Sequence, residues 1–306
     1  MPRHEIVVCT ENIPYMVWQA MLFHHSCMRH LGQAPIIMVH MNDEPLLSGF
    51  DRIRERGGHI QTAPNYHHLN GIAYPARNTA GSMRHVQTDA DYIVLCDPDM
   101  IFLQPLPWRE LSLEPQQVSF DFVGYLNADD PQHQPVVDNV CRQADVDPQS
   151  LRNPHFNGGV PHVIPIRRQK SLSDLWFEQI EVFQRLPTAP LKSPDARPDG
   201  GHIHPQTKWI SIMWALAIAV KRLNLQPVLT RMCISNFDGG RPLPALGKTG
   251  PRLIHYCYQD PGFGKHAFGS QEAAERSVWR VPPDDGSVCG NIRQQLRDAC
   301  GFYGFS

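Results

Sequence analysis

The chain has 306 residues, of which 42% are hydrophobic and 19% are charged, and its 28 Lys and Arg side chains nearly balance 30 Asp and Glu. The apolar content and the net charge of −2 exclude global disorder, and the 28 prolines and 22 glycines exclude a fibrous or coiled-coil protein. A near-neutral chain without runs of Lys and Arg is also a poor candidate for nucleic-acid binding, so no nucleic-acid partner is expected.

Strand and helix signals alternate through the first half of the chain. Apolar runs predict strands over 5–9, 36–41, 59–62 and 91–96, and helical periodicity predicts helices from Pro14 to a stop at Gly32, over 45–56 and over 76–86. This alternation predicts an α/β fold with a mostly parallel sheet and helices on both faces. Ligands of such sheets bind beyond the carboxyl ends of the strands.

The second half of the chain is less regular. We predict strands over 120–126, 228–230 and 253–258, helices over 171–186, 209–223 and 291–299, and a loop over 187–207. No internal repeat or low-complexity linker divides the chain. The sequence therefore predicts one continuous domain over 1–270, followed by a C-terminal extension over 271–306.

The N-terminus carries no apolar segment of the kind that directs export, because MPRH leads straight into the strand-like EIVVCT. The longest largely apolar stretch, 210–220, has 11 residues, whereas about 20 are needed to span a bilayer. The eight cysteines form no CxxC pair, which favours free thiols in a reducing compartment. These features predict a cytoplasmic protein without a membrane span.

The clearest local signal is the segment DYIVLCDPDM, in which a hydrophobic strand delivers Asp97 and Asp99 on either side of a stiff proline. Two carboxylates at the end of a buried strand suit Mg²⁺ or Mn²⁺, and such an ion neutralises charge that develops on a departing phosphate. An acidic turn that caps a strand is the structural alternative, since Asp-x-Asp is a short pattern.

A second signal lies near the other end of the chain. His255 stands within an apolar strand pattern and supplies an imidazole as a third metal ligand. The segment Gly262-Phe263-Gly264-Lys265 combines flexible backbone with a cation that can hold phosphate, although it lacks the pattern of a P-loop. The alternatives are a buried core histidine and a solvated lysine.

Taken together, these blocks resemble the metal-dependent GT-A glycosyltransferases, and more narrowly the hydroxyproline O-arabinosyltransferases and peptidyl-serine α-galactosyltransferases. The matching blocks are YPARN, YIVLCDPDMIFLQPLP, WISIMWALAIAV and RLIHYCYQD, with a weaker match at FNGGVPHVI. The resemblance implies a UDP-sugar donor held through Mn²⁺ or Mg²⁺ on Asp97, Asp99 and His255. It also implies that Arg77 and Lys265 hold the diphosphate, and the family's loop near the nucleobase corresponds here to Thr10, Glu11 and Asn12.

The resemblance further implies a nucleotide-sugar-binding half over 1–126 and an acceptor half over 127–270. Two departures from the family pattern concern the metal site and the acceptor. Asp97 stands where plant members often carry Glu, which shortens the arm but keeps a ligand, and Ile212 stands where the family has a carboxylate. The departure at Ile212 concerns the acceptor, whereas Asp97 retains the donor's metal ligand. The acceptor hydroxyl is expected to belong to a peptide, a glycan or a small molecule.

Catalysis on the acceptor requires a general base if the sugar is transferred with inversion, and the sequence leaves inversion and retention open. The candidates for this base are Asp238, His204 and Asp130, drawn from polar stretches that also contain Asp129, His155 and His202. The expected substrate contacts are Asn157, Gly158 and Trp209.

Two other functions remain open at this point. A haloacid-dehalogenase-like phosphatase would use Asp97 as nucleophile and Asp99 as acid, but Ile101 stands where that motif usually has Thr or Val. A non-catalytic sugar- or metal-binding module is the other alternative, and the intact acid pair with His255 and Lys265 argues against it.

Overall fold

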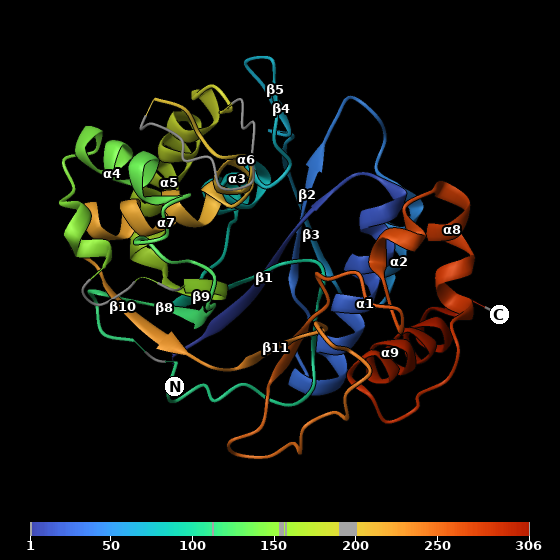
Figure 1. Ribbon diagram of the computed structural model, residues 1–306. Helices are drawn as coiled ribbons and strands as arrows, with labels where there is room; N and C mark the ends of the chain where they lie inside the picture. Colours follow the sequence, from blue (N-terminus) through green and yellow to red (C-terminus); the bar gives the residue numbers. More distant parts are fainter. Residues whose placement is uncertain (1, 112, 153–155, 157, 190–200, 306) are drawn as a thin grey trace. The chain divides into compact units, whose positions relative to one another are not determined.

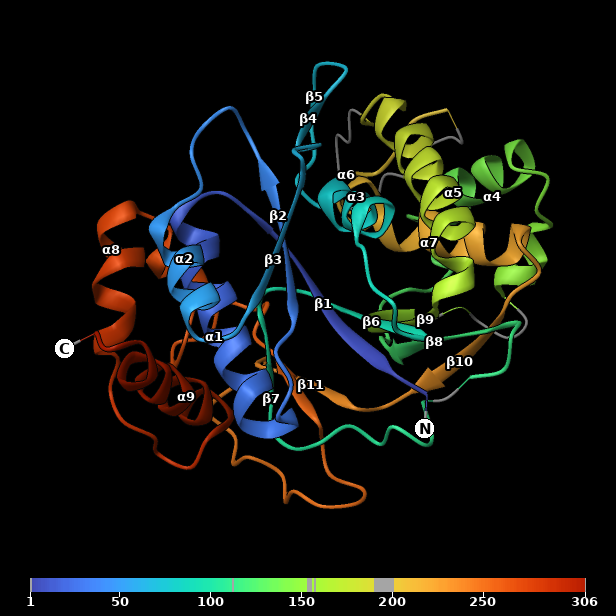
Figure 2. The same cartoon turned by 180° about the vertical axis from the view of Figure 1, so that it is seen from behind.

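The computed structural model describes residues 2–111, 113–152, 156, 158–189 and 201–305. Its chain divides into two compact units (Figures 1 and 2). We call His4–Pro64, Val94–Glu110 and Arg231–Ser306 the N/C unit, because it contains both the early and the late parts of the chain. The middle unit comprises Asn65–Ile93 and Leu111–Thr230, with Met1–Arg3. The predicted boundaries after residues 126 and 270 stay a prediction.

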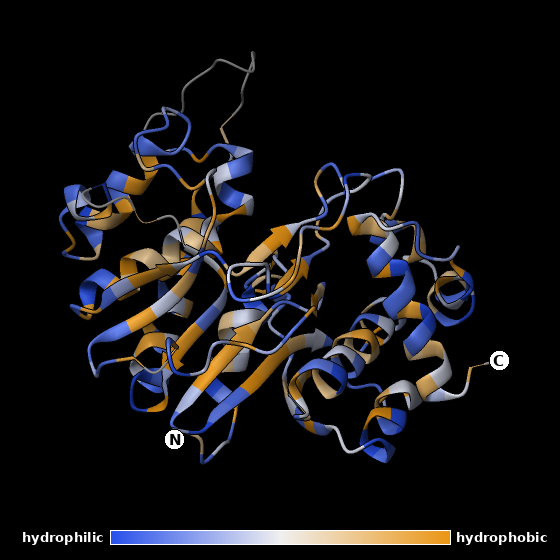
Figure 3. Ribbon diagram, turned by 90° about the horizontal axis from the view of Figure 1, so that it is seen from below, coloured by the Kyte–Doolittle hydropathy of each residue, from blue (hydrophilic) through white to orange (hydrophobic). Residues whose placement is uncertain are grey.

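The N/C unit is built on parallel strands. β1 (His4–Glu11), β2 (Ile36–Met41) and β3 (His59–Pro64) pair in parallel. The other neighbour of β1 is β6 (Tyr92–Cys96), of which Val94 to Cys96 belong to this unit. The runs Ile6–Val8 and Ile36–Val39 are almost fully buried, as expected for strands covered on both faces. Hydrophobic residues dominate several strands in Figure 3.

Helix α1 (Pro14–Leu31) follows β1 and shows how the local sequence sets its ends. Pro14 begins the helix, where its missing N–H costs nothing, and Gly32 ends it at φ 63°. α2 (Ser48–Glu55) begins later than predicted, because the chain at Pro45 is fastened by the amide of Asn12 through a 2.8 Å hydrogen bond.

A second, smaller sheet completes the N/C unit. β7 (Met100–Phe102) pairs antiparallel with β12 (Leu253–His255), which pairs in parallel with β11 (Cys233–Ser235). The short helices η2 (Lys265–Phe268), α8 (Gln271–Glu275) and η3 (Ser277–Arg280) then lead to α9 (Val288–Tyr303). The Tyr303 hydroxyl lies 2.6 Å from Nδ1 of His24, so α9 is fastened to α1.

The middle unit combines a sheet with helices. β8 (Gln117–Phe122) pairs in parallel with β10 (Gln226–Thr230) and antiparallel with β9 (Gly158–Pro165). Its other elements are the hairpin β4 (His68–Leu69) and β5 (Ile72–Ala73), with α3 (Arg77–His85), α4 (Gln134–Gln143), η1 (Pro148–Leu151), α5 (Ile166–Arg185), α6 (Pro205–Trp209) and α7 (Ser211–Arg222). α7 is held to α5 by the Trp176 indole, which donates a 2.8 Å hydrogen bond to the Ile212 carbonyl.

Several predicted boundaries were wrong for local reasons. The strand predicted over 120–126 ends at Phe122, because the chain turns at Tyr125, whose carbonyl accepts from the Asn127 N–H at 3.1 Å. The loop predicted over 187–207 contains the start of α6, which His204 caps, and its residues 190–200 lie outside the described residues. β7 and α4 were not predicted. The α/β class and the mostly parallel pairing are confirmed for the described strands.

Two further expectations concern membranes and thiols. Over the part of the chain that the structure describes, no helix combines the length and the apolar character needed to cross a bilayer. All eight cysteines are free, and five of them are buried, as predicted.

His162 makes the middle unit sensitive to acid. The side chain is buried on β9 between the rings of Phe120 and Trp176, with centroid distances of 5.3 and 5.8 Å. Burial lowers its pKa to about 3. The unfolded chain binds a proton near pH 6.5 whereas the folded chain does not, so stability is lost as the pH falls from 6.5 toward 3.

We therefore expect this histidine to cost about 2 kcal/mol of folding free energy between pH 7.5 and pH 5. Urea denaturation at both pH values tests this, and His162→Phe should remove that part of the acid sensitivity. His68→Gln, a change at an exposed histidine of the same unit, is the control. An equal loss of stability in wild type and His162→Phe would contradict the assignment.

Candidate metal and nucleotide site

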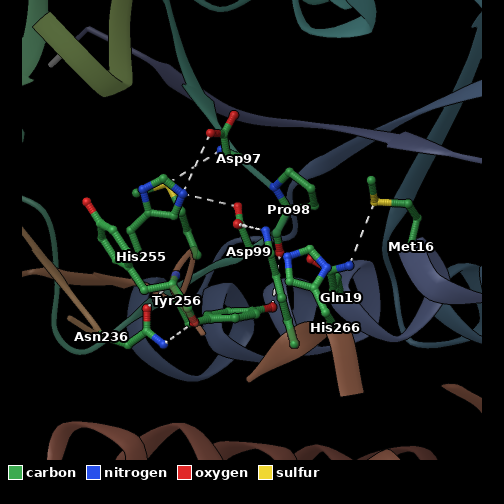
Figure 4. A network of polar contacts seen from close by, with 12 residues as sticks. Met16, Gln19, Asp97, Pro98, Asp99, Asn236, His255, Tyr256 and His266 are labelled. Carbon is green, nitrogen blue, oxygen red and sulfur yellow. Dashed lines mark hydrogen bonds and ion pairs between the residues drawn. The ribbon is translucent and has the colours of Figure 1, made fainter. Parts of the chain in front are cut away.

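The Asp-Pro-Asp segment lies in the turn between β6 and β7, and strand pairing brings His255 to it (Figure 4). In the antiparallel pair of β7 and β12, His255 lies opposite Met100, the residue that follows Asp99. The carbonyl of Asp99 accepts a 2.9 Å hydrogen bond from the Tyr256 N–H. The backbone of β12 therefore fixes the position of the acid pair and of the imidazole together.

Asp97, Asp99 and His255 each offer one ligand atom, and these atoms lie within 4.8 Å of one another. The imidazole Nε2 lies 3.2 Å from Oδ1 of Asp99 and 3.8 Å from Oδ2 of Asp97. The Asp99 side chain is only 7% exposed, whereas those of His255 and Asp97 are 22% and 31% exposed. Two carboxylates and one imidazole with a partly open side fit a divalent cation such as Mn²⁺ or Mg²⁺.

Lys265 begins η2 and contributes a cation to the same cluster. Its ammonium contacts Oδ2 of Asp99, and its side chain is 16% exposed. The loop that carries it is tightly held: Asp260 accepts from the Gly262 N–H at 2.7 Å, and Arg293 of α9 donates to the Gly262 carbonyl at 2.7 Å. Arg293 also donates to Asp285 at 2.7 Å.

The charges in this cluster shift one another's pKa values. Burial, reinforced by the negative charge of Asp99, raises the pKa of Asp97 above its ordinary value. Burial acts in the same direction on Asp99, but His255 and Lys265 outweigh it and lower the pKa of that carboxyl. The pKa of His255 is raised, because Asp99 outweighs the effect of burial on the imidazole. The site therefore balances its buried carboxylate with two cationic groups from the chain itself.

Tyr256 stabilises the Asp-Pro-Asp turn. Its ring is fully buried and stacks on Trp18 of α1, with centroids 6.1 Å apart, and its hydroxyl donates a 3.2 Å hydrogen bond to the Pro98 carbonyl. The strand predicted over 253–258 ends at His255. After it, the Tyr256 N–H donates to the Asp99 carbonyl and the Tyr258 N–H donates to the Asn236 side chain, so neither pairs with a strand. Sequence reasoning gave Tyr256 no role, and its adjacency to His255 is the signal that could have suggested one.

The N/C unit also holds the residues expected near the nucleobase. Thr10 and Glu11 end β1 and are buried, as is Asn12 directly after it. The Thr10 hydroxyl lies 3.4 Å from the Met38 carbonyl, and the Asn12 amide bridges the Pro45 carbonyl and the Leu47 N–H at 2.8 and 3.0 Å. Their contact with a nucleobase stays a prediction.

Arg77 has a different set of partners from the one expected. Its side chain in the middle unit is fully buried, and its Nε donates a 2.6 Å hydrogen bond to Glu181 of α5. Its Nη1 donates to the carbonyls of Tyr66, His67 and Ile72 at 2.8, 3.1 and 3.3 Å. In this conformation Arg77 ties the β4–β5 hairpin to α5. Its expected contact with a diphosphate stays a prediction, and it would require the guanidinium to leave this pair.

The expected acceptor residues occupy varied surroundings. Gly158 begins β9, where a Cβ would lie 2.9 Å from Phe120, so glycine is needed there for packing. Trp209 is 64% exposed at the end of α6, with the ring of Tyr74 6.4 Å away in an edge arrangement. Asn157 and His155 lie outside the described residues.

The candidates for a general base make local contacts. His204 caps α6 by accepting from the Gln206 N–H at 3.1 Å, and Asp130 accepts from the Gln132 N–H at 2.8 Å. Asp129 pairs with Arg152 at 2.7 Å. Asp238 is exposed, with φ 53°, in the turn after β11. Their expected role in proton transfer stays a prediction.

Sequence reasoning also missed an exposed aromatic pair. Phe237 and Tyr258 are 67% and 37% exposed, and their rings meet edge to face with centroids 5.4 Å apart. Phe237 follows β11 and Tyr258 follows β12, whose last residues, Ser235 and His255, are register partners. Asn236 is fully buried and fixes the backbone of Tyr258 with hydrogen bonds of 2.9 and 2.8 Å. Aromatic residues two and three positions after the ends of two strands are the signal that could have found this pair.

Comparison with known proteins shows which family and which solved folds this chain is similar to. The family model for the hydroxyproline O-arabinosyltransferase family N-terminal domain matches residues 74–229. The chain is 25% identical over 276 residues to the peptidyl serine alpha-galactosyltransferase of Arabidopsis thaliana, an alignment that covers 83% of this chain but only 30% of that protein. The chain thus spans less than a third of the length of this relative.

Among solved structures, the galactosyltransferase LgtC in complex with donor and acceptor sugar analogs matches with a TM-score of 0.50 at 12% identity, over 89% of this chain and 95% of that one. The WbbM bifunctional glycosyltransferase matches over 96% of this chain and 50% of its own, at 10% identity and a TM-score of 0.46. The likeness to LgtC shows the fold, and the predicted GT-A-like α/β fold is confirmed.

The hydrogen bonds of Arg293 generate a prediction for the loop that carries Lys265. Arg293→Gln should lower the free energy of unfolding by about 1–3 kcal/mol, because it removes the charged hydrogen bonds that the buried Arg293 side chain donates to the Gly262 carbonyl and to Asp285. It should also speed amide hydrogen exchange in residues 262–266. Exchange measured by mass spectrometry checks this, with Arg297→Gln at an exposed position of the same helix as control. Unchanged exchange in this loop would show that Arg293 does not hold it.

Proposed function

This chain belongs to the hydroxyproline O-arabinosyltransferase family, and on that premise we propose that it transfers a sugar from a UDP-sugar to a hydroxyl group with the help of a divalent cation. The observation that carries the proposal is the cluster of Asp97, Asp99 and His255, whose ligand atoms lie within 4.8 Å of one another. Mn²⁺ or Mg²⁺ on these residues would neutralise the charge that develops on the departing diphosphate.

The chain's own groups provide the remaining parts of the donor site. Lys265 lies at this cluster and is suited to hold a phosphate oxygen as a compact point charge. The end of β1, with Thr10, Glu11 and Asn12, is proposed to lie near the nucleobase, and Arg77 to contact the diphosphate after leaving Glu181. Asp97 in place of Glu keeps a carboxylate on the metal.

The acceptor is proposed to be a hydroxyl on a peptide, a glycan or a small molecule, which makes the reaction an O-glycosylation. A peptide is favoured by the relative whose name specifies a peptidyl serine. Asn157, Gly158 and Trp209 are the proposed acceptor contacts within an acceptor half over 127–270, beside a nucleotide-sugar-binding half over 1–126. A general base, if inversion requires one, is proposed to come from Asp238, His204 and Asp130. Ile212, where the family has a carboxylate, leaves the choice of acceptor open.

Family membership favours this function over a haloacid-dehalogenase-like phosphatase. The position of His255 also argues for a ligand set: its Nε2 lies 3.2 Å from Asp99, the residue that the phosphatase mechanism would use as a free acid. A measurement of sugar transfer distinguishes a transferase from a non-catalytic module with the same ligands.

Calorimetric titration of UDP in the presence and absence of Mn²⁺ tests the donor site. We expect UDP to bind with Mn²⁺ and to lose more than about tenfold in affinity without it, because the diphosphate then lacks its bridging charge. Asp97→Asn should produce a similar loss with Mn²⁺ present. This substitution leaves the contact of Lys265 with Asp99 in place, so the fold of the site is retained.

Glu55→Gln, a change at an exposed carboxylate of the N/C unit, is the matched control and should bind UDP as the wild type does. Wild-type protein that binds no UDP under either condition would overturn the proposed donor. Mn²⁺-dependent UDP binding without sugar release from any UDP-sugar, tested with serine peptides and sugars as acceptors, would identify a binding module instead of an enzyme.

A further inference from the structure

Both carboxylate oxygens of Asp99 are in contact with cationic groups of the chain. Lys265 contacts Oδ2, and the His255 imidazole lies 3.2 Å from Oδ1. The Asp99 side chain is 7% exposed, so these two groups, and not water, balance most of its charge. Asp97 differs, because its side chain is 31% exposed and the nearest cationic group lies 3.8 Å away. Of the two acids, Asp99 is thus the one whose ligand atoms are already engaged.

This arrangement places Lys265 in competition with a divalent cation. A metal bound by Asp97, Asp99 and His255 would stand within a few ångströms of the ammonium that now neutralises Asp99. Two positive charges at such distances repel strongly in a site of low exposure. A buried ammonium without its carboxylate is also unfavourable, so Lys265 has to find another anion when a metal enters.

The loop allows the side chain to move while its base stays fixed. Arg293 and Asp260 hold Gly262, and Phe263 is buried against Trp18 and Tyr256. Gly264 fits closely, since a Cβ there would lie 2.1 Å from Oε1 of Gln259. Rotation about the flexible four-carbon arm of the lysine is therefore the easiest route for its ammonium to leave Asp99.

We propose that Lys265 is an internal counter-ion of Asp99 that the incoming metal displaces, and that the displaced ammonium then binds the nucleotide diphosphate. The proposal rests on the donor chemistry proposed above. It makes the binding of metal and nucleotide mutually dependent. The metal alone must break the Lys265–Asp99 ion pair, whereas with nucleotide present the same lysine gains a phosphate partner. The affinity of each ligand is therefore raised by the other through this side chain.

Titration of Mn²⁺ in the absence of nucleotide, followed by the electron paramagnetic resonance signal of the free ion, tests the displacement. Lys265→Met should bind Mn²⁺ roughly tenfold more tightly than wild type, because no ammonium has to leave Asp99. The same variant should bind UDP roughly tenfold more weakly at saturating Mn²⁺, so the mutual enhancement of the two ligands largely disappears. Lys265→Arg, which keeps the charge, should bind Mn²⁺ as weakly as wild type.

Lys248→Met is the matched control, since Lys248 is an exposed lysine of the same unit. Lys265→Gln repeats the measurement if circular dichroism shows that the methionine variant does not fold. Mn²⁺ affinity that stays equal or falls when Lys265 is neutralised, while UDP binding still requires Mn²⁺, would overturn this inference and leave the proposed donor intact. Failure of wild type to bind either ligand would instead overturn the proposed function.

Discussion

The antiparallel pairing of β7 with β12 is the constraint on which the site depends. It joins a segment directly after Asp99 to a segment from the last fifth of the chain, and it places His255 beside the acid pair. The Tyr256 N–H extends the pairing by bonding to the Asp99 carbonyl at 2.9 Å. Hydrogen bonds between main-chain groups thus bring two carboxylates, Asp97 and Asp99, next to the imidazole of His255. The charges of these side chains then determine which ions the site favours.

The parts of the fold that could be predicted are those that local sequence determines. The strand predicted over 36–41 has the same bounds as β2. Pro14 and Gly32 marked the ends of α1, because proline is favoured at the start of a helix and glycine just after its end. Asp97 and Asp99 could be proposed as candidates for a similar reason, since a buried strand followed by paired acids is visible within ten residues. The family blocks then connected these acids to His255.

The parts that could not be predicted depend on partners distant in sequence. β7 is only three residues long, and its strand character comes from β12 and not from its own pattern. The conformation of Arg77 is set by Glu181, which lies on another helix, so its position at the start of a helix gave no sign of burial. Asn236 and Arg293 stand in polar segments where nothing local separates a solvated side chain from one that fixes a loop.

The hydrogen bond between Arg293 and the Gly262 carbonyl has a consequence for how the protein can be engineered. Within the predicted C-terminal extension over 271–306, α9 contacts the loop that carries Lys265 and, through Tyr303, the first helix. A truncation before α9 or an insertion at Gly286 would therefore remove or shift the groups that hold this loop. Conversely, substitutions along the buried side of this helix offer a way to tune the site without altering any group in it.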